Sequence, residues 1–156
     1  MTSSNWKRRS LVLSLCLVCL PAVASLGGNE QSIDSERVRM HAYRSVRAQV
    51  GYTVHELTTA DGSRIRQFVD ASGQVFAVSW TAQHKPDLSA LLGASFPTYA
   101  QAARTAGERG GVQRRFRHAS ADLIVQSNGH LHLFNGYALR RSLVPTAFVA
   151  RDHGME

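Results

Sequence analysis

The middle of the chain alternates between apolar and polar residues with the period of β-strands. Three segments rich in Val, Thr and aromatic residues show this alternation: 52–59, 64–69 and 75–81. They are separated by Asp61-Gly62 and by Ala71-Ser72-Gly73, which are typical hairpin turns. We therefore expect a three-stranded antiparallel meander, with Phe76, Val78 and Trp80 together on one buried face.

The segment before these strands has helical periodicity. Ser32 or Asp34 can cap a helix that runs to about Val46, with apolar residues on one side and arginines toward another. The apolar positions are Ile33, Met40, Tyr43, Val46 and Val50. A basic amphipathic helix can lie on a membrane, but its apolar stripe more often packs on the sheet of its own domain. We expect the second arrangement.

Two short helices follow the meander. Asp87 is placed to cap a helix that ends at Gly93, and a second helix is expected from Pro97 to Gly107. Gly110-Gly111 then marks a loop.

The last part of the domain is expected to form further strands. Their expected ranges are 112–118, 122–127 and 130–135. Asn128-Gly129 predicts a two-residue hairpin turn, which would pair Ser127 with His130, Val125 with His132 and Leu123 with Phe134. The expected fold class is α+β: an antiparallel sheet of about five to six strands in two meanders, with an N-terminal helix and a short helical pair packed on it.

The first residues have the pattern of a cleavable secretory signal. The cations Lys7, Arg8 and Arg9 precede an apolar run, Leu11–Leu20, and Ala22-Val23-Ala24 offers a small-x-small cleavage site. The run is about half as long as a membrane-spanning helix requires. A buried N-terminal helix of a cytosolic domain is the alternative, but such a helix would show a polar stripe.

We expect cleavage between Ala24 and Ser25, by either the general or the twin-arginine export route. The expected organisation is a signal peptide at 1–24, a flexible leader at 25–31, one α+β domain at 32–150 and a polar tail at 151–156. The mature chain would then contain no transmembrane segment. We expect a bacterial protein that is periplasmic or secreted.

Export changes what the composition implies. Cys16 and Cys19 leave with the signal, so the mature domain is expected to have no disulfide and no thiol chemistry. Loss of the three N-terminal cations lowers the net charge from +7 to +4. A basic chain can bind nucleic acid, but an exported domain does not meet that partner. Anionic components of the cell envelope, or an unknown envelope protein, are the expected partners.

Several short motifs in the mature chain resemble one family. The motifs are Leu26-Gly27-Gly28, residues 52–57 (Tyr-Thr-Val-His-Glu-Leu), residues 73–80 (Gly-Gln-Val-Phe-Ala-Val-Ser-Trp), Pro86-Asp87-Leu88, Leu91-Leu92-Gly93 and Gly129-His130. In this order they are similar to the DUF2844 family of exported bacterial proteins, whose function is undefined. The resemblance implies export and assigns no catalytic residue. The family has a Met-Arg pair where this chain has Leu131-His132, so a metal role for His132 would not be a family trait.

His130 and His132 are the weak candidates for a metal site. Residues two apart on a strand point the same way, so both imidazoles could bind one ion. However, zinc requires three or four ligands, and the neighbours implied by the predicted hairpin include no carboxylate. His55-Glu56 look like a catalytic pair, yet adjacent strand residues face opposite sides. A metal-dependent enzyme is therefore the second alternative function, and we expect no cofactor.

Two arginine clusters are the other candidate site. Arg115 and Arg117 share one face of an expected strand, and they point to water if Phe116 points to the core. Arg140 and Arg141 follow later in the chain. The simplest interpretation is an edge strand protected by charge; the functional one is a patch for an anionic ligand.

Together these patterns predict a non-catalytic binding or interaction domain. A binder of anionic lipid, lipopolysaccharide or glycan through a basic surface is the first alternative. The chain has no nucleophile elbow, phosphate-binding glycine loop or zinc-protease motif, so the sequence argues against an enzyme.

Overall fold

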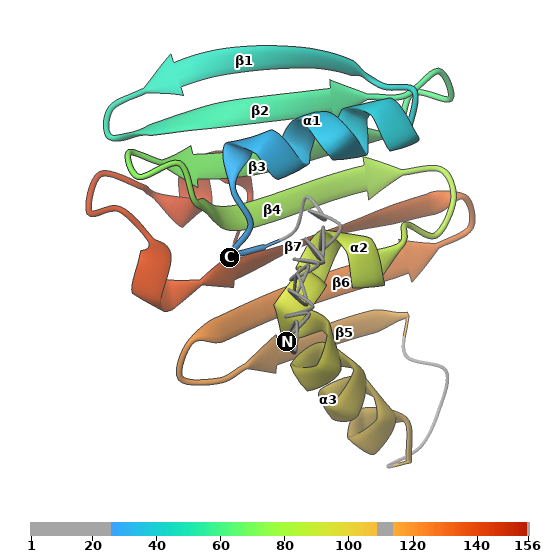
Figure 1. Cartoon of the computed structure of the whole chain (residues 1–156). Coiled ribbons are helices and arrows are strands. Elements are labelled where there is room, and N and C mark those ends of the chain that lie inside the picture. The colour runs from blue at the N-terminus through green and yellow to red at the C-terminus, as the bar shows by residue number, and fades with distance from the viewer. Residues whose placement is uncertain (1–25, 109–113, 156) are drawn as a thin grey trace, which may run out of the picture.

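The computed structural model describes residues 26–108 and 114–155. The expected signal peptide, its cleavage site at Ala24 and Ser25, and the Gly110-Gly111 loop lie outside the described residues. In the described part of the chain, seven strands form one antiparallel sheet in the order β1-β2-β3-β4-β7-β6-β5 (Figure 1). The predicted α+β class is confirmed, with one strand more than expected.

The strands are β1 (Tyr43–Gln49), β2 (Tyr52–Thr58), β3 (Arg64–Asp70), β4 (Val75–Ala82), β5 (Arg115–Ala119), β6 (Leu123–His130) and β7 (Leu133–Arg140). The helices are α1 (Glu30–Arg39), α2 (Leu88–Leu92) and α3 (Phe96–Glu108). Short 3-10 turns are η1 (Gly93–Ser95), which joins α2 to α3, η2 (Arg141–Leu143) and η3 (Ala150–His153). The meander of β2, β3 and β4 and the capped helix α2, with Asp87 at its start and Gly93 at its end, are as predicted.

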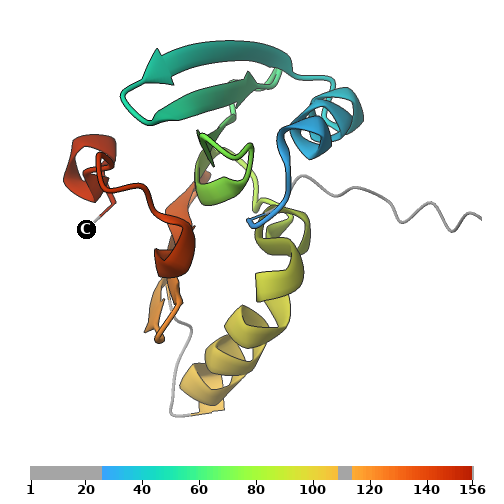
Figure 2. The ribbon, with the colours of Figure 1, turned by 60° about the vertical axis from the view of Figure 1, so that its left-hand side comes forward.

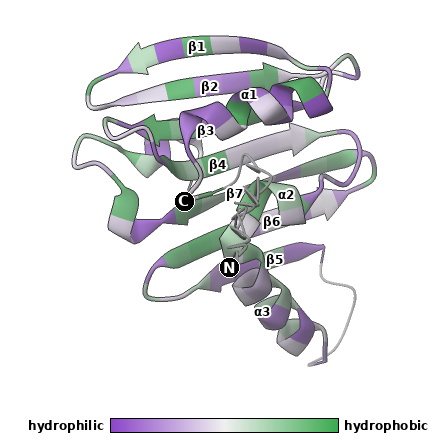
Figure 3. Ribbon diagram, viewed as in Figure 1, coloured by the Kyte–Doolittle hydropathy of each residue, from purple (hydrophilic) through white to green (hydrophobic). Residues whose placement is uncertain are grey.

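All three helices cover one face of the sheet, whereas the C-terminal segment (residues 141–155) crosses the other face (Figure 2). On the helix-covered face, Ile33 of α1 and Leu91 of α2 are buried with Trp80 of β4. On the opposite face, Phe148 and Met155 of the C-terminal segment are buried against strand residues. Hydrophilic residues recur along the edge strands β1 and β5 (Figure 3). The sheet is therefore buried on both sides at its centre and polar toward its edges.

The prediction of a helix continuing to about Val46 is wrong. Helix α1 ends at Arg39, because His41 adopts a left-handed backbone with φ 50°. The backbone N–H of His41 donates to the Val38 carbonyl and that of Ala42 donates to the Arg37 carbonyl, which closes the helix as a Schellman motif. The N-cap is Asn29, not Ser32 or Asp34. Residues 43–49 then form edge strand β1, so the apparent helical stripe of Tyr43, Val46 and Val50 is largely exposed.

The prediction that Phe76 shares a face with Val78 and Trp80 is also wrong. All three side chains are buried, but the β3–β4 pairing shifts register between Phe68 and Val69 and leaves Phe76 in a bulge. Phe76 consequently packs on the side of the C-terminal segment, while Val78 and Trp80 pack under the helices.

The hairpin turn predicted at Asn128-Gly129 is displaced. Strand β6 continues through both residues to His130, which pairs with Leu133, and the turn consists of Leu131 and His132. His132 supplies the positive φ of 61° that the turn requires. Gly129 instead lies opposite Phe134 and leaves room for its ring, since a Cβ there would lie 3.1 Å from Phe134 Cδ1. Every predicted cross-strand pair of this hairpin is therefore wrong: Ser127 faces Gly136, Val125 faces Ala138 and Leu123 faces Arg140.

None of the helices in the described ranges 26–108 and 114–155 is long and apolar enough to span a bilayer.

Candidate functional site

The sheet face opposite the helices carries two rows of polar residues that cross five strands. Residues paired directly across antiparallel strands project to the same side, so the rows follow from the strand register. The first row is Arg64, Thr81, Asn135, Asn128 and Arg115, and the second is Arg66, Ser79, Tyr137, Gln126 and Arg117. In each row, an arginine on β3 and an arginine on β5 enclose the polar residues of β4, β7 and β6. We call this surface the polar face.

The arginines at the two ends of the polar face differ in their partners. Arg66 is bound to Glu56 of β2, with its Nε 2.8 Å from Glu56 Oε2. Arg64, Arg115 and Arg117 are exposed, and none of them forms an ion pair with another residue that the structure describes. These three guanidinium groups are available to an anion from solvent.

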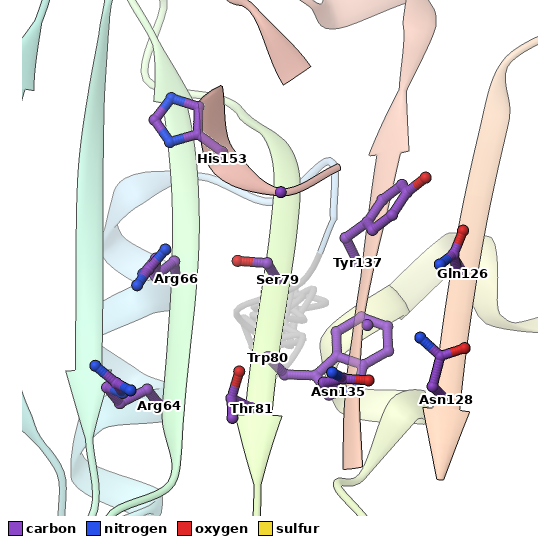
Figure 4. A pocket seen from close by; sticks show the side chains of 12 residues that line it. Arg64, Arg66, Ser79, Trp80, Thr81, Gln126, Asn128, Asn135, Tyr137 and His153 are labelled. Carbon is purple, nitrogen blue, oxygen red and sulfur yellow. The ribbon is translucent and has the colours of Figure 1, made fainter. Parts of the chain in front are cut away.

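The centre of the polar face supplies uncharged hydrogen-bonding groups. Ser79 and Thr81 present hydroxyl groups, while Gln126, Asn128 and Asn135 present amides, each of which can donate and accept. Asn128 Oδ1 is itself buried and has no hydrogen-bond partner among the described residues. Figure 4 shows these side chains beside Arg64 and Arg66. Tyr137, the remaining central member, is buried rather than presented to solvent.

The C-terminal segment forms one wall of a hollow of about 170 Å³ on the polar face. His153 and Gly154 line this hollow together with the row residues of β3, β4, β7 and β6 (Figure 4). Arg115 and Arg117 of β5 are not among its lining residues. The His153 ring stacks on Phe148, with 5.3 Å between ring centroids, and its Nε2 lies 2.8 Å from the Tyr52 hydroxyl. Burial lowers the pKa of His153, and the nearby Arg66 lowers it further, while Asp152 acts in the opposite direction. Near neutral pH the imidazole is thus uncharged, and the positive charge of the hollow comes from its arginines.

The structure separates the four arginines that the sequence suggested as a patch. Arg115 and Arg117 lie on edge strand β5, with Phe116 buried behind them, as the alternation implies. Arg140 faces the helix-covered side, since it pairs with Leu123, and both its Nε and Nη2 lie 2.9 Å from Asp122 Oδ2. Arg141 is exposed in turn η2 after β7. Of these four arginines, only Arg115 and Arg117 belong to the polar face.

Sequence reasoning identified only Arg115 and Arg117 of the polar face; Arg64 and Arg66 are the charged members that it missed. Their alternation with Ile65 and Gln67 already places both on the solvent side of a predicted strand. What the sequence lacks is the pairing of β4 with β7, which brings β3 and β5 to opposite ends of one continuous surface.

The two candidate metal ligands do not share a strand face. His130 ends β6 and His132 lies in the turn, and both side chains are exposed. Within the described residues no group of three or more His, Cys, Asp or Glu side chains is arranged to hold a metal ion. As expected for adjacent strand residues, His55 and Glu56 face opposite sides of the sheet. His55 is buried under α1, whereas Glu56 lies on the opposite side and binds Arg66.

A second hollow, of about 400 Å³, lies between α1 and the segment that leads into α2. Met40, Ile65 and Leu91 give it an apolar lining, and Glu36 of α1 is one of its polar residues. Glu36 is only 3 % exposed; its Oε2 accepts a hydrogen bond of 2.6 Å from Gln67 Nε2, and Arg39 Nη2 lies 3.2 Å from Oε1. Burial raises the pKa of Glu36 to about 7, although both neighbours favour the ionised form. Sequence reasoning did not single out Glu36, because nothing local distinguishes it from an exposed helical glutamate.

The family comparison agrees with the resemblance seen in the motifs. A family model described as "Protein of unknown function (DUF2844)" matches residues 22–152, and the chain belongs to this family. No curated protein and no solved structure matches the chain.

Proposed function

For this member of the DUF2844 family, we propose a non-catalytic binding domain of the bacterial cell envelope whose polar face binds an anionic ligand. The observation that carries the proposal is the placement of two arginines at each end of the polar face, three of them without an ion-pair partner in the described part of the chain. Guanidinium groups bind carboxylate and phosphate groups in a forked geometry that lysine does not reproduce. Lys85 is the only lysine after residue 24.

The envelope location is part of the proposal. It is supported by the charged, apolar and small-residue pattern of residues 1–24, which is typical of a signal peptide. It is also supported by the resemblance to exported proteins. An envelope location directs the positive surface toward acidic lipids, lipopolysaccharide and acidic glycans rather than toward nucleic acid.

Binding to dextran sulfate, with uncharged dextran as the reference polymer, tests the proposal. We expect the purified protein to bind dextran sulfate at low salt and to lose most of this binding at high salt, because salt screens exposed charge pairs. It should not bind dextran, which carries no charge. The double variant Arg115→Gln/Arg117→Gln should bind about tenfold more weakly, which corresponds to about 1.4 kcal/mol.

The matched control is Arg104→Gln, which removes an exposed arginine from α3 on the helix-covered side. It should bind like the unmodified protein. This control removes one charge where the double variant removes two, so a loss of about threefold in the control would show that net charge alone drives binding. Full binding by the double variant would show that the polar face is not the binding site. The melting temperature of each variant shows whether the fold is retained.

A further inference from the structure

We propose that the ligand of the polar face is an extended acidic polysaccharide chain that crosses the strands and contacts the arginines at both ends. This inference rests on the proposed function and adds the class of ligand and its direction. Three features of the polar face carry it: the separation of its charges, the direction of its rows and the chemistry of its centre.

The separation of the arginines excludes a compact ligand that engages both ends. Strands β3 and β5 are separated by β4, β7 and β6, hence by four strand spacings. At about 4.8 Å per spacing, the backbones of β3 and β5 lie about 19 Å apart. A single carboxylate or phosphate group can contact only one end. A ligand that uses both ends must therefore be a chain with repeated negative charges.

The direction of the chain follows from the rows. Each row runs perpendicular to the strands, because it consists of directly paired residues. A chain that lies along Thr81, Asn135 and Asn128 travels from Arg64 to Arg115 without leaving the row. The second row offers no such continuous path, because its central member Tyr137 is buried with Phe148 and Met155 of the C-terminal segment.

The chemistry of the centre suits a sugar chain. Between the arginines the presented groups are hydroxyls and amides, which can each donate to and accept from the hydroxyl groups of a saccharide. No carboxylate belongs to either row, so nothing in the rows repels an acidic chain. Two described carboxylates lie beside the Arg66 end of the second row. Glu56 is neutralised by Arg66 at 2.8 Å, and the exposed Asp152 lines a neighbouring pocket together with Arg66.

The same rows are poorly suited to a lipid surface. Membrane-surface binding buries exposed apolar side chains as well as neutralising charge, and the two rows contain no aliphatic residue. Two exposed aliphatic side chains lie beyond the Asn128–Asn135 pair of the first row: Leu133, which pairs with His130, and Leu131 in the hairpin turn. The observations thus favour a soluble acidic polymer over a bilayer.

A chain held at two ends gains affinity through effective concentration. Once one end is bound, the other arginine end meets the chain at a high local concentration, so affinity rises when the chain is long enough to reach it. A chain too short to span the face obtains no such gain. The proposal therefore predicts that affinity depends on the length of the chain.

The experiment measures binding of oligogalacturonides of increasing length at low salt, by calorimetry. We expect affinity to rise by about tenfold once the oligomer spans the face, and to change little with further length. Arg64→Gln and Arg115→Gln remove opposite ends of the first row, and neither breaks a described ion pair. Each single variant should weaken binding of the spanning oligomer, and the double variant should abolish the rise with length.

Two further probes separate this inference from its alternatives. Poly-glutamate carries regularly spaced carboxylates on a peptide chain, and vesicles containing an anionic phospholipid carry phosphate groups on a bilayer. Binding to either that is tighter than to the long oligogalacturonide overturns the polysaccharide assignment. Binding to dextran sulfate together with equal affinity for all oligomer lengths overturns the spanning geometry while leaving the proposed function intact. If none of these polyanions binds, both the proposed function and the polysaccharide inference are wrong.

Discussion

Replacing Gly136 with alanine should destabilise the protein by about 3 kcal/mol or more, because the new methyl group has no room. Gly136 lies in β7 directly opposite Trp80 of β4, and the indole ring occupies the space above the glycine. A Cβ at this position would overlap the backbone carbonyl oxygen of Gln126 and would lie 2.5 Å from Trp80 Cζ2. Neither the strand backbone nor a buried indole can move away without disrupting the sheet. The measurement is the free energy of unfolding from chemical denaturation.

Gly107 provides the matched control for this substitution. It lies in α3, and a Cβ there would meet no atom within 4 Å. Gly107→Ala should therefore be neutral or stabilise the protein by up to about 1 kcal/mol, because alanine has a higher helix propensity. If Gly136→Ala were as stable as Gly107→Ala, the close packing of Trp80 on β7 would be incorrect.

Replacing Glu36 with glutamine should alter the pH dependence of stability by about 3 kcal/mol. The buried carboxyl has its pKa raised to about 7 in the folded protein, against 4.5 for the ordinary side chain, and each pKa unit corresponds to about 1.36 kcal/mol. The folded state therefore binds the proton more tightly than the unfolded state does. The stability that Glu36 contributes is complete below pH 4.5 and is lost as the pH rises through 7.

Glutamine resembles the protonated carboxyl and does not titrate. The Glu36→Gln variant should consequently gain stability relative to the unmodified protein between pH 4.5 and about 7, and keep that gain at higher pH. The measurement is the difference in unfolding free energy between the two proteins at each pH. This difference cancels the contributions of His55 and His153, whose lowered pKa values have the opposite sign in an overlapping pH range.

Asp34→Asn tests whether any carboxylate of α1 would produce the same effect. Asp34 is exposed on this helix, and its hydrogen bond from Arg37 Nε at 2.8 Å lowers the pKa of the carboxyl. The stability that ionised Asp34 contributes is therefore lost as the pH falls. Asp34→Asn should be slightly less stable than the unmodified protein at neutral pH, and this difference should vanish at low pH, which is the opposite sign to Glu36→Gln. A difference between Glu36→Gln and the unmodified protein that does not vary with pH would mean that Glu36 is not buried as described.

The local elements of the sheet centre were predictable because their signals are short and strong. Asp61-Gly62 and the glycine at 73 end strands at the expected places, and Asp87 caps α2 through hydrogen bonds to the backbone of Ser89 and Ala90. The end of α1 was not predictable in this way. Its left-handed residue is His41 rather than glycine, so the stop signal is absent from the sequence.

For a related reason, only part of the polar face could be predicted from the sequence. Alternation along one strand correctly places Arg115 and Arg117 on the exposed side of β5 and Phe116 in the core. The Asn128-Gly129 dipeptide, in contrast, predicts a turn that the pairing of β6 with both neighbours overrides. A turn preference of one dipeptide is outweighed when two strands continue to pair through it.

The sequence by itself determined the α+β class, the central meander, the capped helix and the charge of the outer strand, because each depends on interactions between residues close along the chain. Only the tertiary structure decided the seven-strand order, the burial of Glu36 and the alignment of β3 with β5 across the polar face. These features arise where β4 pairs with β7 and where α1 packs on β3, contacts between residues distant in the chain. The energy of these contacts depends on the three-dimensional arrangement, so no local sequence pattern predicts them.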